Sequence, residues 1–247
     1  MNRNKFIKIS SIAGLGIVAL PQVSFTGTLQ DFTRDQLIGK GNPDIEGASY
    51  TQTMHKETKA ALEKMKAAAA KDAIYIEVVS AYRSFQRQKE IFEGKYTRFT
   101  NQGLAPEDAI NKIIEYSTIP GTSRHHWGTD IDIIQAKVPK PESVLQPKHF
   151  HGNGPFCKLK DWLTEHAADF GFYEVYTDNA NRKGFKYEPW HFSYAPVSKP
   201  MLQAYKKLNL NQVFTEEKIK GSEHFTEAFI SKYRSENILD INPKLLS

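Results

Sequence analysis

The chain of 247 residues has little of several features that define common protein classes. It contains one cysteine, Cys157, so no internal disulfide framework can form. The apolar run at residues 9–20 is shorter than the roughly 20 residues that a membrane-spanning helix needs. Three of the five surplus positive charges lie in residues 1–30, so the remainder is too weakly basic to predict a nucleic-acid-binding surface. No internal repeat or low-complexity tract is present.

What is present is an ordinary globular composition, with 40% hydrophobic, 12% aromatic and 25% charged residues. The length allows one large or two small domains, each with its own core. Residues 1–8 are basic, the apolar run follows, and Pro21 and small polar residues come next, which is the pattern of an export signal. We assign this signal to residues 1–26 and expect an exported protein, periplasmic or associated with the cell envelope, with no other membrane segment.

Helical and strand patterns follow one another without a regular strand–helix–strand rhythm, which predicts an α+β fold. Helices are expected at 53–71, at 85–98 with Ser84 as N-cap, from Pro106 to Tyr116, and at 158–169. Strands are expected at 74–82, at 129–135, and as a pair at 170–176 and 185–194. Residues 27–50 read as an irregular arm. We divide the chain after the signal into a domain at 27–196 and a helical C-terminal extension at 197–247.

Two segments combine histidines with carboxylates. Residues 123–132 (SRHHWGTDID) carry two histidines that run into an acidic strand, and residues 188–191 read EPWH. A catalytic zinc ion takes three protein ligands and keeps one position open, with a carboxylate base beside it. One histidine and one aspartate of the first segment, together with His191, would supply the ligands, and Glu188 would be the base. Because Pro189 cannot donate a ladder hydrogen bond, Glu188 and His191 are expected at a strand edge or bulge.

These segments resemble the VanY-type D-alanyl-D-alanine carboxypeptidase family. The first is similar to the family's S-x-H-x-x-G-x-A-x-D motif, and Glu188-x-x-His191 is similar to the second half of its zinc site. Residues 80–88 (SAYRSFQRQ) resemble a third element, S-[GA]-Y-R-S-x-x-x-Q. The three motifs occur in the family's order within a core at 74–194, so together they are far more specific than any one motif.

The resemblance implies that a single Zn²⁺ ion is bound by His125, Asp132 and His191, with Glu188 as the catalytic base. One position departs from the family pattern, because Asp130 stands where a small residue, usually alanine, is common. Asp130 and Asp132 project from the same face of the strand, so either could reach a metal. The spacing from His125 favours Asp132 as the ligand.

The resemblance also assigns roles around the metal. Arg83 would be catalytic and would bind substrate, facing the scissile carbonyl or the terminal carboxylate of the peptide, while Ser123 and Gln88 would help to position the substrate. The implied fold is a small antiparallel sheet flanked by helices, shared with zinc D,D-dipeptidases and the Hedgehog signalling domain. Trp127 and Trp190 are expected as packing walls of the cleft, His126 behind the ligands or at the rim, and Cys157 as a small buried residue.

The sequence therefore predicts an exported, monomeric zinc carboxypeptidase that removes the C-terminal D-alanine from peptidoglycan stem peptides. One alternative is an L,D-carboxypeptidase or an endopeptidase that acts on the same peptides with the same metal ligands. Another is a zinc-containing module that binds wall peptide without cleaving it. Glu188 favours an enzyme, because a carboxylate base beside an intact ligand set serves catalysis. A structural zinc site is disfavoured, because such sites are usually closed and rich in cysteine.

Overall fold

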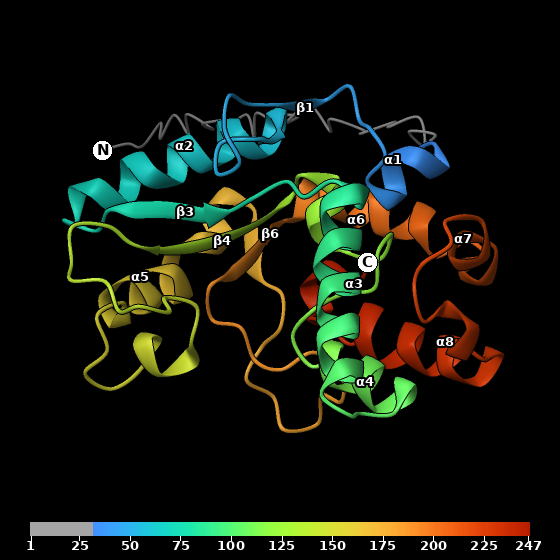
Figure 1. Cartoon of the computed structure of the whole chain (residues 1–247). Helices are drawn as coiled ribbons and strands as arrows, with labels where there is room; N and C mark the ends of the chain where they lie inside the picture. The colour runs from blue at the N-terminus through green and yellow to red at the C-terminus, as the bar shows by residue number, and fades with distance from the viewer. Residues whose placement is uncertain (1–31) are drawn as a thin grey trace, which may run out of the picture. The chain divides into compact units, whose positions relative to one another are not determined.

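A computed structural model describes residues 32–247, and Figure 1 shows how their helices and strands are arranged. The predicted export signal at 1–26 lies outside the described residues. Within 32–247, no helix is both long enough and apolar enough to cross a membrane. The α-helices are α1 (Arg34–Ile38), α2 (Lys56–Lys71), α3 (Phe85–Asn101), α4 (Pro106–Ile113), α5 (Cys157–His166), α6 (Ala195–Tyr205), α7 (Leu210–Glu216) and α8 (Glu227–Tyr233). The strands are β1 (Ile45–Glu46), β2 (Met54–His55), β3 (Ile76–Ser80), β4 (Asp130–Gln135), β5 (Phe172–Glu174) and β6 (His191–Tyr194).

Four strands form one antiparallel sheet in the order β3-β4-β6-β5, while β1 and β2 form a separate pair. The register places Asp132 of β4 directly between Ser80 of β3 and His191 of β6. Directly opposed residues in adjacent strands point to the same face of a sheet, with Cβ atoms about 5 Å apart. Residues from three separate parts of the chain therefore meet at one level of this face. The predicted α+β class and the small antiparallel sheet flanked by helices are confirmed.

Local sequence accounts for where the helices around the site begin. The Ser84 hydroxyl accepts the Arg87 backbone N–H at 3.2 Å and caps α3, as predicted. Pro106 is the first residue of α4, where its missing N–H costs nothing. The prediction of an irregular arm missed α1, which is held by a capping box between Thr33 and Gln36.

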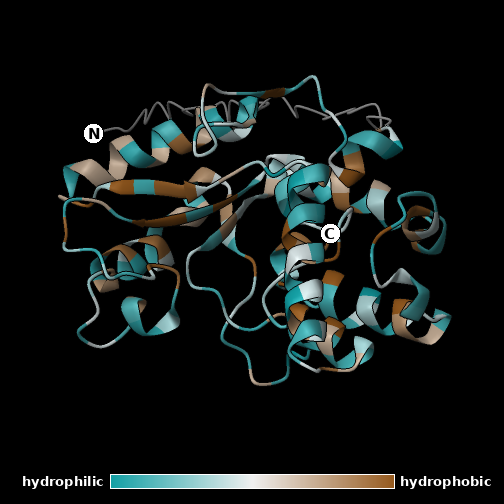
Figure 2. Cartoon of the chain, in the orientation of Figure 1, coloured by the Kyte–Doolittle hydropathy of each residue, from teal (hydrophilic) through white to brown (hydrophobic). Residues whose placement is uncertain are grey.

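The apolar faces divide the described residues into two main clusters. Ile131 and Ile133 of β4 pack with α2 and α5 on one side of the sheet, and Figure 1 shows α2 running along the strands. The larger cluster joins α1, α3 and α4 to helices of the C-terminal segment, for example through Met201 of α6 and Tyr233 of α8. Figure 2 shows hydrophobic residues on strand β3 and on the inner sides of these helices. The acids of β4 occupy the face opposite to Ile131 and Ile133.

Candidate metal centre

His125 lies in a single 3-10 turn, Arg124–Trp127, that leads into β4. The turn ends at Gly128, whose φ of +67° is in the left-handed region that favours glycine. A Cβ at this position would lie 2.6 Å from the His55 backbone nitrogen, so no side chain fits there. The tight turn returns the chain toward β4 at once. As a result the side chains of His125 and Asp132, which are seven residues apart, lie next to each other.

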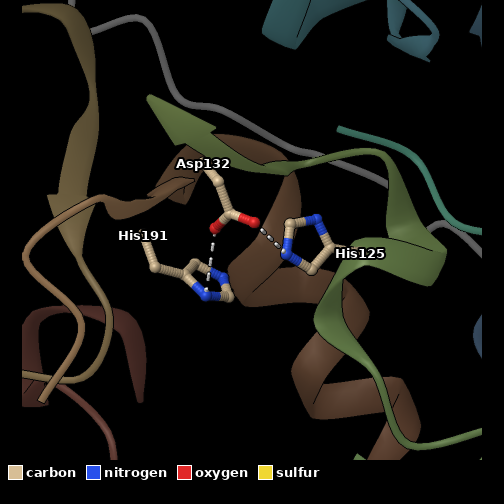
Figure 3. A group of neighbouring side chains, drawn as sticks. All are labelled: His125, Asp132 and His191. Atoms are coloured by element: carbon tan, nitrogen blue, oxygen red, sulfur yellow. Dashed lines mark ion pairs between the residues drawn. The ribbon is translucent and has the colours of Figure 1, made fainter. Parts of the chain in front are cut away.

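His125, Asp132 and His191 form a buried group whose ligand atoms all lie within 4.8 Å of one another. Figure 3 shows the Asp132 carboxylate between the two imidazole rings. His125 Nε2 is 3.5 Å from Asp132 Oδ2, and His191 Nδ1 is 3.7 Å from Asp132 Oδ1. Two neutral imidazoles and a carboxylate are a ligand set that zinc accepts in catalytic sites.

The other nitrogen of each ring is already occupied. His125 Nδ1–H donates to the Ala81 carbonyl oxygen at 2.7 Å, which leaves Nε2 free on the side of Asp132. His191 Nε2 lies 3.0 Å from the Asp130 carboxylate, so Nδ1 is the nitrogen that faces Asp132 and Glu188. Hydrogen bonds of this kind fix which nitrogen of a metal-binding histidine is available.

The polar atoms of the group are suited to binding a cation. Asp132 Oδ1 is buried and has no hydrogen-bond partner, and such an atom is costly unless something binds it. His191 Nδ1 lies 3.0 Å from Glu188 Oε2 and also faces Asp132. Burial by itself would lower the pKa of His191, but its hydrogen bonds to Asp130 and Glu188 and the nearby carboxylate charges raise it to about 10. The residues present therefore fit a divalent metal, which would replace the second imidazole proton.

Asp130 is not part of this ligand group, although it shares the strand face with Asp132. Its Oδ1 accepts the hydroxyl protons of Ser193 and Thr129, at 2.6 and 2.8 Å. Its Oδ2 accepts Arg124 Nε–H at 2.8 Å in addition to the contact with His191. Burial would raise the pKa of Asp130, but the Arg124 charge and the His191 hydrogen bond hold it well below 3.8. Every acceptor position of this carboxylate is used, whereas Asp132 keeps one oxygen free.

Glu188 reaches the group from a turn that precedes β6. The His191 N–H donates to the Glu188 carbonyl at 3.1 Å, which closes the turn, and Glu188 N–H donates to the Tyr176 carbonyl at 3.1 Å. The expectation of a strand edge or bulge was wrong, because β6 is an inner strand that begins only at His191. The turn has the effect that was expected of an edge or bulge, because it brings the side chains of Glu188 and His191 together although they are three residues apart.

Arg83 follows β3 and is held on both sides of its guanidinium group. Nη1 donates to Gln88 Oε1 at 2.9 Å, and Nη2 donates to Ser80 Oγ at 3.2 Å. Gln88 is fully buried, and its amide nitrogen donates to the Thr118 carbonyl at 2.6 Å. Any contribution of Gln88 to substrate binding would therefore pass through Arg83. Ser123 is buried beside the ligands and, like Arg83, lines the cavity described below.

His126 is buried behind the ligands and does not reach the rim. Its Nδ1–H donates to the Arg83 carbonyl at 2.6 Å, and its Nε2 accepts the Gly121 N–H at 3.1 Å. Burial lowers the pKa of His126 to about 3, so the ring is neutral and can make both bonds. The adjacent residue, His125, also accepts the Arg83 N–H on its carbonyl, so the strand end and the histidine turn are joined at several points.

A cavity of about 430 Å³ opens onto the group. Its wall includes the predicted site residues Arg83, Ser123, His125, Asp132, Glu188 and His191. Trp190 lines it as expected, but Trp127 does not: its indole N–H donates to the Leu37 carbonyl in the helical cluster. Cys157 was expected to be buried and is only half-buried.

The wall also contains residues that carried no recognisable signal in the sequence. They come from three separate segments and are Tyr116, Ser117, Thr118, Ser143, Leu145, Gln146, Pro147, Tyr176 and Phe185. Tyr176 packs edge-on against the His191 ring at 5.0 Å between centroids. Burial raises the pKa of Tyr176 well above 10, so it presents a protonated phenol. Only the path of the chain brings these loops to the metal-binding side chains.

Comparison with known proteins agrees with this geometry. The D-alanyl-D-alanine carboxypeptidase family VanY matches residues 51–197, more than half of the chain. The chain belongs to the VanY family. It is thus a metallopeptidase of the D-alanyl-D-alanine carboxypeptidase type, and His125, Asp132 and His191 form its zinc site.

The chain is also similar to individual curated proteins. A D-alanyl-D-alanine carboxypeptidase of Enterococcus faecalis is 25% identical over 198 residues, which cover 75% of this chain and 69% of that protein. The putative carboxypeptidase YodJ of Bacillus subtilis is 29% identical over 185 residues, or 72% of this chain and 60% of that protein. An uncharacterized protein of Haemophilus influenzae is 33% identical over 107 residues, or 42% of this chain and 82% of that one.

The fold has counterparts among solved structures. VanYB in complex with D-alanine-D-alanine has a TM-score of 0.50 and 24% identity, and the match covers 72% of this chain and 91% of that one. A mutant of the vancomycin-resistance D,D-pentapeptidase VanY in complex with Zn(II) has a TM-score of 0.49 and 25% identity, covering 69% and 89%. The VanYB match places the present chain in the VanY fold.

Proposed function

We propose that this VanY-family protein is an exported carboxypeptidase that removes the C-terminal D-alanine from peptidoglycan stem peptides. The observation that carries the proposal is the placement of a metal ligand set, a carboxylate and a guanidinium group in the wall of one cavity. The substrate is suggested by the E. faecalis relative, which is a D-alanyl-D-alanine carboxypeptidase. The basic and apolar N-terminal pattern supports export, since stem peptides lie outside the cytoplasm.

Zinc bound at this site would polarise the scissile carbonyl and lower the pKa of a water molecule toward about 7. Glu188 would take up the proton of the attacking water. Its Oε2 lies 3.0 Å from His191 Nδ1, at the edge of the ligand group, and its own carboxylate is not part of that group. After attack, the same carboxylic acid returns the proton to the departing amine of the released D-alanine.

Arg83 would bind the terminal carboxylate that distinguishes a carboxypeptidase substrate from an internal peptide bond. A guanidinium group presents its donors in a planar fork that matches a carboxylate. The hydrogen bonds to Gln88 and Ser80 hold that fork in place before the substrate arrives. The Ser123 hydroxyl, on the same wall, would position the peptide alongside it.

The test is mass spectrometry of purified pentapeptide and tetrapeptide muropeptides after incubation with the zinc-loaded protein. We expect the pentapeptide to lose one alanine. Glu188→Ala should retain zinc but show no turnover, because it removes the base and leaves the ligands. Glu77→Ala, which removes an exposed carboxylate paired with Lys140, should cleave like the wild type.

The other outcomes separate the alternatives. Trimming of the tetrapeptide alone would make the protein an L,D-carboxypeptidase. Cleavage within the stem would make it an endopeptidase. A zinc-loaded protein that binds the peptides and cleaves neither would be a wall-peptide binding module. Full activity in Glu188→Ala would remove Glu188 from the mechanism.

A further inference from the structure

Asp130 is a charged side chain at the metal centre that stands where the family pattern has a small residue. It is fully buried on β4, two residues before the ligand Asp132, and its strand partner is Ser193 of β6. Ser193 and the ligand His191 lie on the same face of β6, so Asp130 lies diagonally behind His191. A small residue, usual in the family, would leave this space to other groups.

We propose that Asp130 is a positioning residue, which holds the His191 ring so that Nδ1 faces the metal. The Asp130 carboxylate accepts the Nε2–H at 3.0 Å, on the ring edge opposite to Nδ1. A carboxylate can only accept here, so Nε2 keeps its proton. Nδ1, which lies 3.0 Å from Glu188 Oε2, is then the nitrogen at which a cation would replace a proton. The contact also fixes the rotation of the ring.

Asp130 is itself held by three side chains that are not metal ligands. Arg124 Nε–H donates to Oδ2 at 2.8 Å, and Arg124 Nη2 donates to the Ser193 hydroxyl at 2.7 Å. The Ser193 hydroxyl then donates to Oδ1 at 2.6 Å, and Thr129 donates to the same oxygen. Arg124, Ser193 and Asp130 thus form a closed ring of hydrogen bonds. All three side chains are buried, which strengthens these hydrogen bonds, and Arg124 also lines the cavity.

The two aspartates of the strand therefore have different tasks. Asp132 has an oxygen without a hydrogen-bond partner and lies between the two imidazoles, where it can bind the metal. Asp130 has donors on both oxygens and touches the metal centre only through His191. Hydrogen-bond partners that orient metal ligands typically contribute about 10- to 100-fold to metal affinity.

This inference rests on the proposed zinc-dependent function, and the experiment keeps the two apart. Zinc affinity of the full chain is measured by competition with a chromogenic chelator, for the wild type and Asp130→Asn. We expect Asp130→Asn to bind zinc about 10- to 100-fold more weakly. Asp72→Asn changes an aspartate that accepts only the Trp162 indole N–H, far from the site in the fold, and should bind like the wild type.

A second measurement reports on the His191 imidazole directly. In ¹⁵N–¹H spectra of the zinc-loaded wild type, His191 should show a protected Nε2 proton, and Asp130→Asn should lose that protection. If Asp130→Asn fails to fold, Ser193→Ala opens the same ring of hydrogen bonds and should change both readouts in the same direction by a smaller factor.

Zinc affinity within threefold of the wild type, with an unchanged His191 signal, would overturn the proposal. Weaker zinc binding with an unchanged His191 signal would also overturn it, because Asp130 would then not act through the His191 imidazole. A wild type that shows both expected readouts but cleaves no muropeptide would leave the role of Asp130 standing and reject the proposed function instead.

Discussion

At the scale of single residues, the metal centre depends on which atom of each side chain is left free. The Ala81 carbonyl occupies His125 Nδ1, and Asp130 occupies His191 Nε2. One ring therefore presents Nε2 and the other Nδ1, and Asp132 lies between them. Burial would raise the pKa of Asp132, but the charges of His125, His191 and Arg83 lower it below 3.8. Asp132 is therefore ionised and ready to bind a cation at neutral pH.

Arg83 provides the first prediction at this scale. Arg83→Lys keeps the positive charge but loses the planar fork and its bonds to Gln88 and Ser80. We expect kcat/KM for the pentapeptide to fall about 10- to 100-fold, since a hydrogen bond to a charged group contributes about 1.5–3 kcal/mol. The loss should be mainly in KM, measured by steady-state release of D-alanine.

The control for this variant is Arg87→Lys, on the exposed side of α3, where Arg87 pairs with Glu90. It should leave both kinetic constants unchanged, because exposed ion pairs contribute little. An unchanged KM in Arg83→Lys would mean that another group binds the terminal carboxylate.

At the scale of elements, the histidine turn depends on Gly128. Gly128→Ala would force a side chain into the left-handed region and place its Cβ 2.6 Å from the backbone of His55. We expect a loss of at least about 1–2 kcal/mol in the free energy of unfolding, from the backbone conformation alone, together with weaker zinc binding. Urea denaturation of the metal-free protein and chelator competition measure the two effects.

Gly94 is the matched control, since it lies within α3 and a Cβ there would meet nothing within 4 Å. Gly94→Ala should stabilise the protein by up to about 1 kcal/mol, because alanine favours the helix. Equal stability of the two alanine variants would show that the turn tolerates a side chain.

Helix α2 provides a pH-dependent prediction through its N-cap, His55. Its Nδ1 accepts the Glu57 N–H at 3.3 Å, which only an unprotonated nitrogen can do. Burial lowers the pKa of His55 below 6.5, and the charges of Glu57 and Asp44 oppose this only in part. The unfolded chain therefore binds this proton more tightly than the folded protein does. The stabilising contribution is complete above about pH 6.5 and is lost as the pH falls from there toward the lower folded-state pKa.

The variant His55→Asn keeps an N-cap that does not titrate. We expect its free energy of unfolding to fall less between pH 7.5 and 5.5 than that of the wild type, in urea denaturation of the metal-free protein. His151→Asn changes an exposed histidine and should keep the wild-type pH dependence. An equal pH dependence in all three proteins would contradict a cap made by neutral His55.

At the scale of the whole molecule, the C-terminal segment is bound to the site through shared packing. Tyr233 of α8 is almost completely buried, and its hydroxyl accepts the Ile119 N–H at 3.1 Å and contacts the Thr122 hydroxyl at 2.9 Å. Tyr205 of α6 donates to the Gly121 carbonyl at 2.7 Å. The loop that these residues hold runs directly into the histidine turn. Burial raises the pKa of Tyr233 to about 12, so its phenol stays protonated.

Metal binding should therefore stabilise the molecule as a whole. A ligand present at 100 times its Kd adds about 2.7 kcal/mol to the free energy of unfolding. We expect EDTA to lower the midpoint of thermal unfolding by roughly 5–10 °C, given about 2–4 °C per kcal/mol for a chain of this size. Asp132→Asn should show no such difference, whereas His149→Asn, outside the ligand group, should behave like the wild type. A midpoint that EDTA leaves unchanged would argue against a ligand set of this kind.

Much of this protein follows from the sequence alone, because its signals are local. The Ser84 cap, the start of α4 at Pro106 and the alternation of acids and isoleucines in β4 each depend on neighbouring residues. The spacing from His125 through Gly128 to Asp132 is also local, since one tight turn joins the histidine to the strand. These features predicted the α+β class, and the resemblance of the motifs to the VanY family implied the three zinc ligands.

Only the tertiary structure decided the rest. The register that places Ser80, Asp132 and His191 at one level joins segments more than 50 residues apart. The same register puts Asp130 behind His191. From the strand pattern alone, either Asp130 or Asp132 could have been the metal ligand. The wall formed by Tyr176 and the distant loops also lacks any local pattern. Sequence spacing reports contacts along the chain, whereas packing and strand pairing determine which distant groups share a buried site.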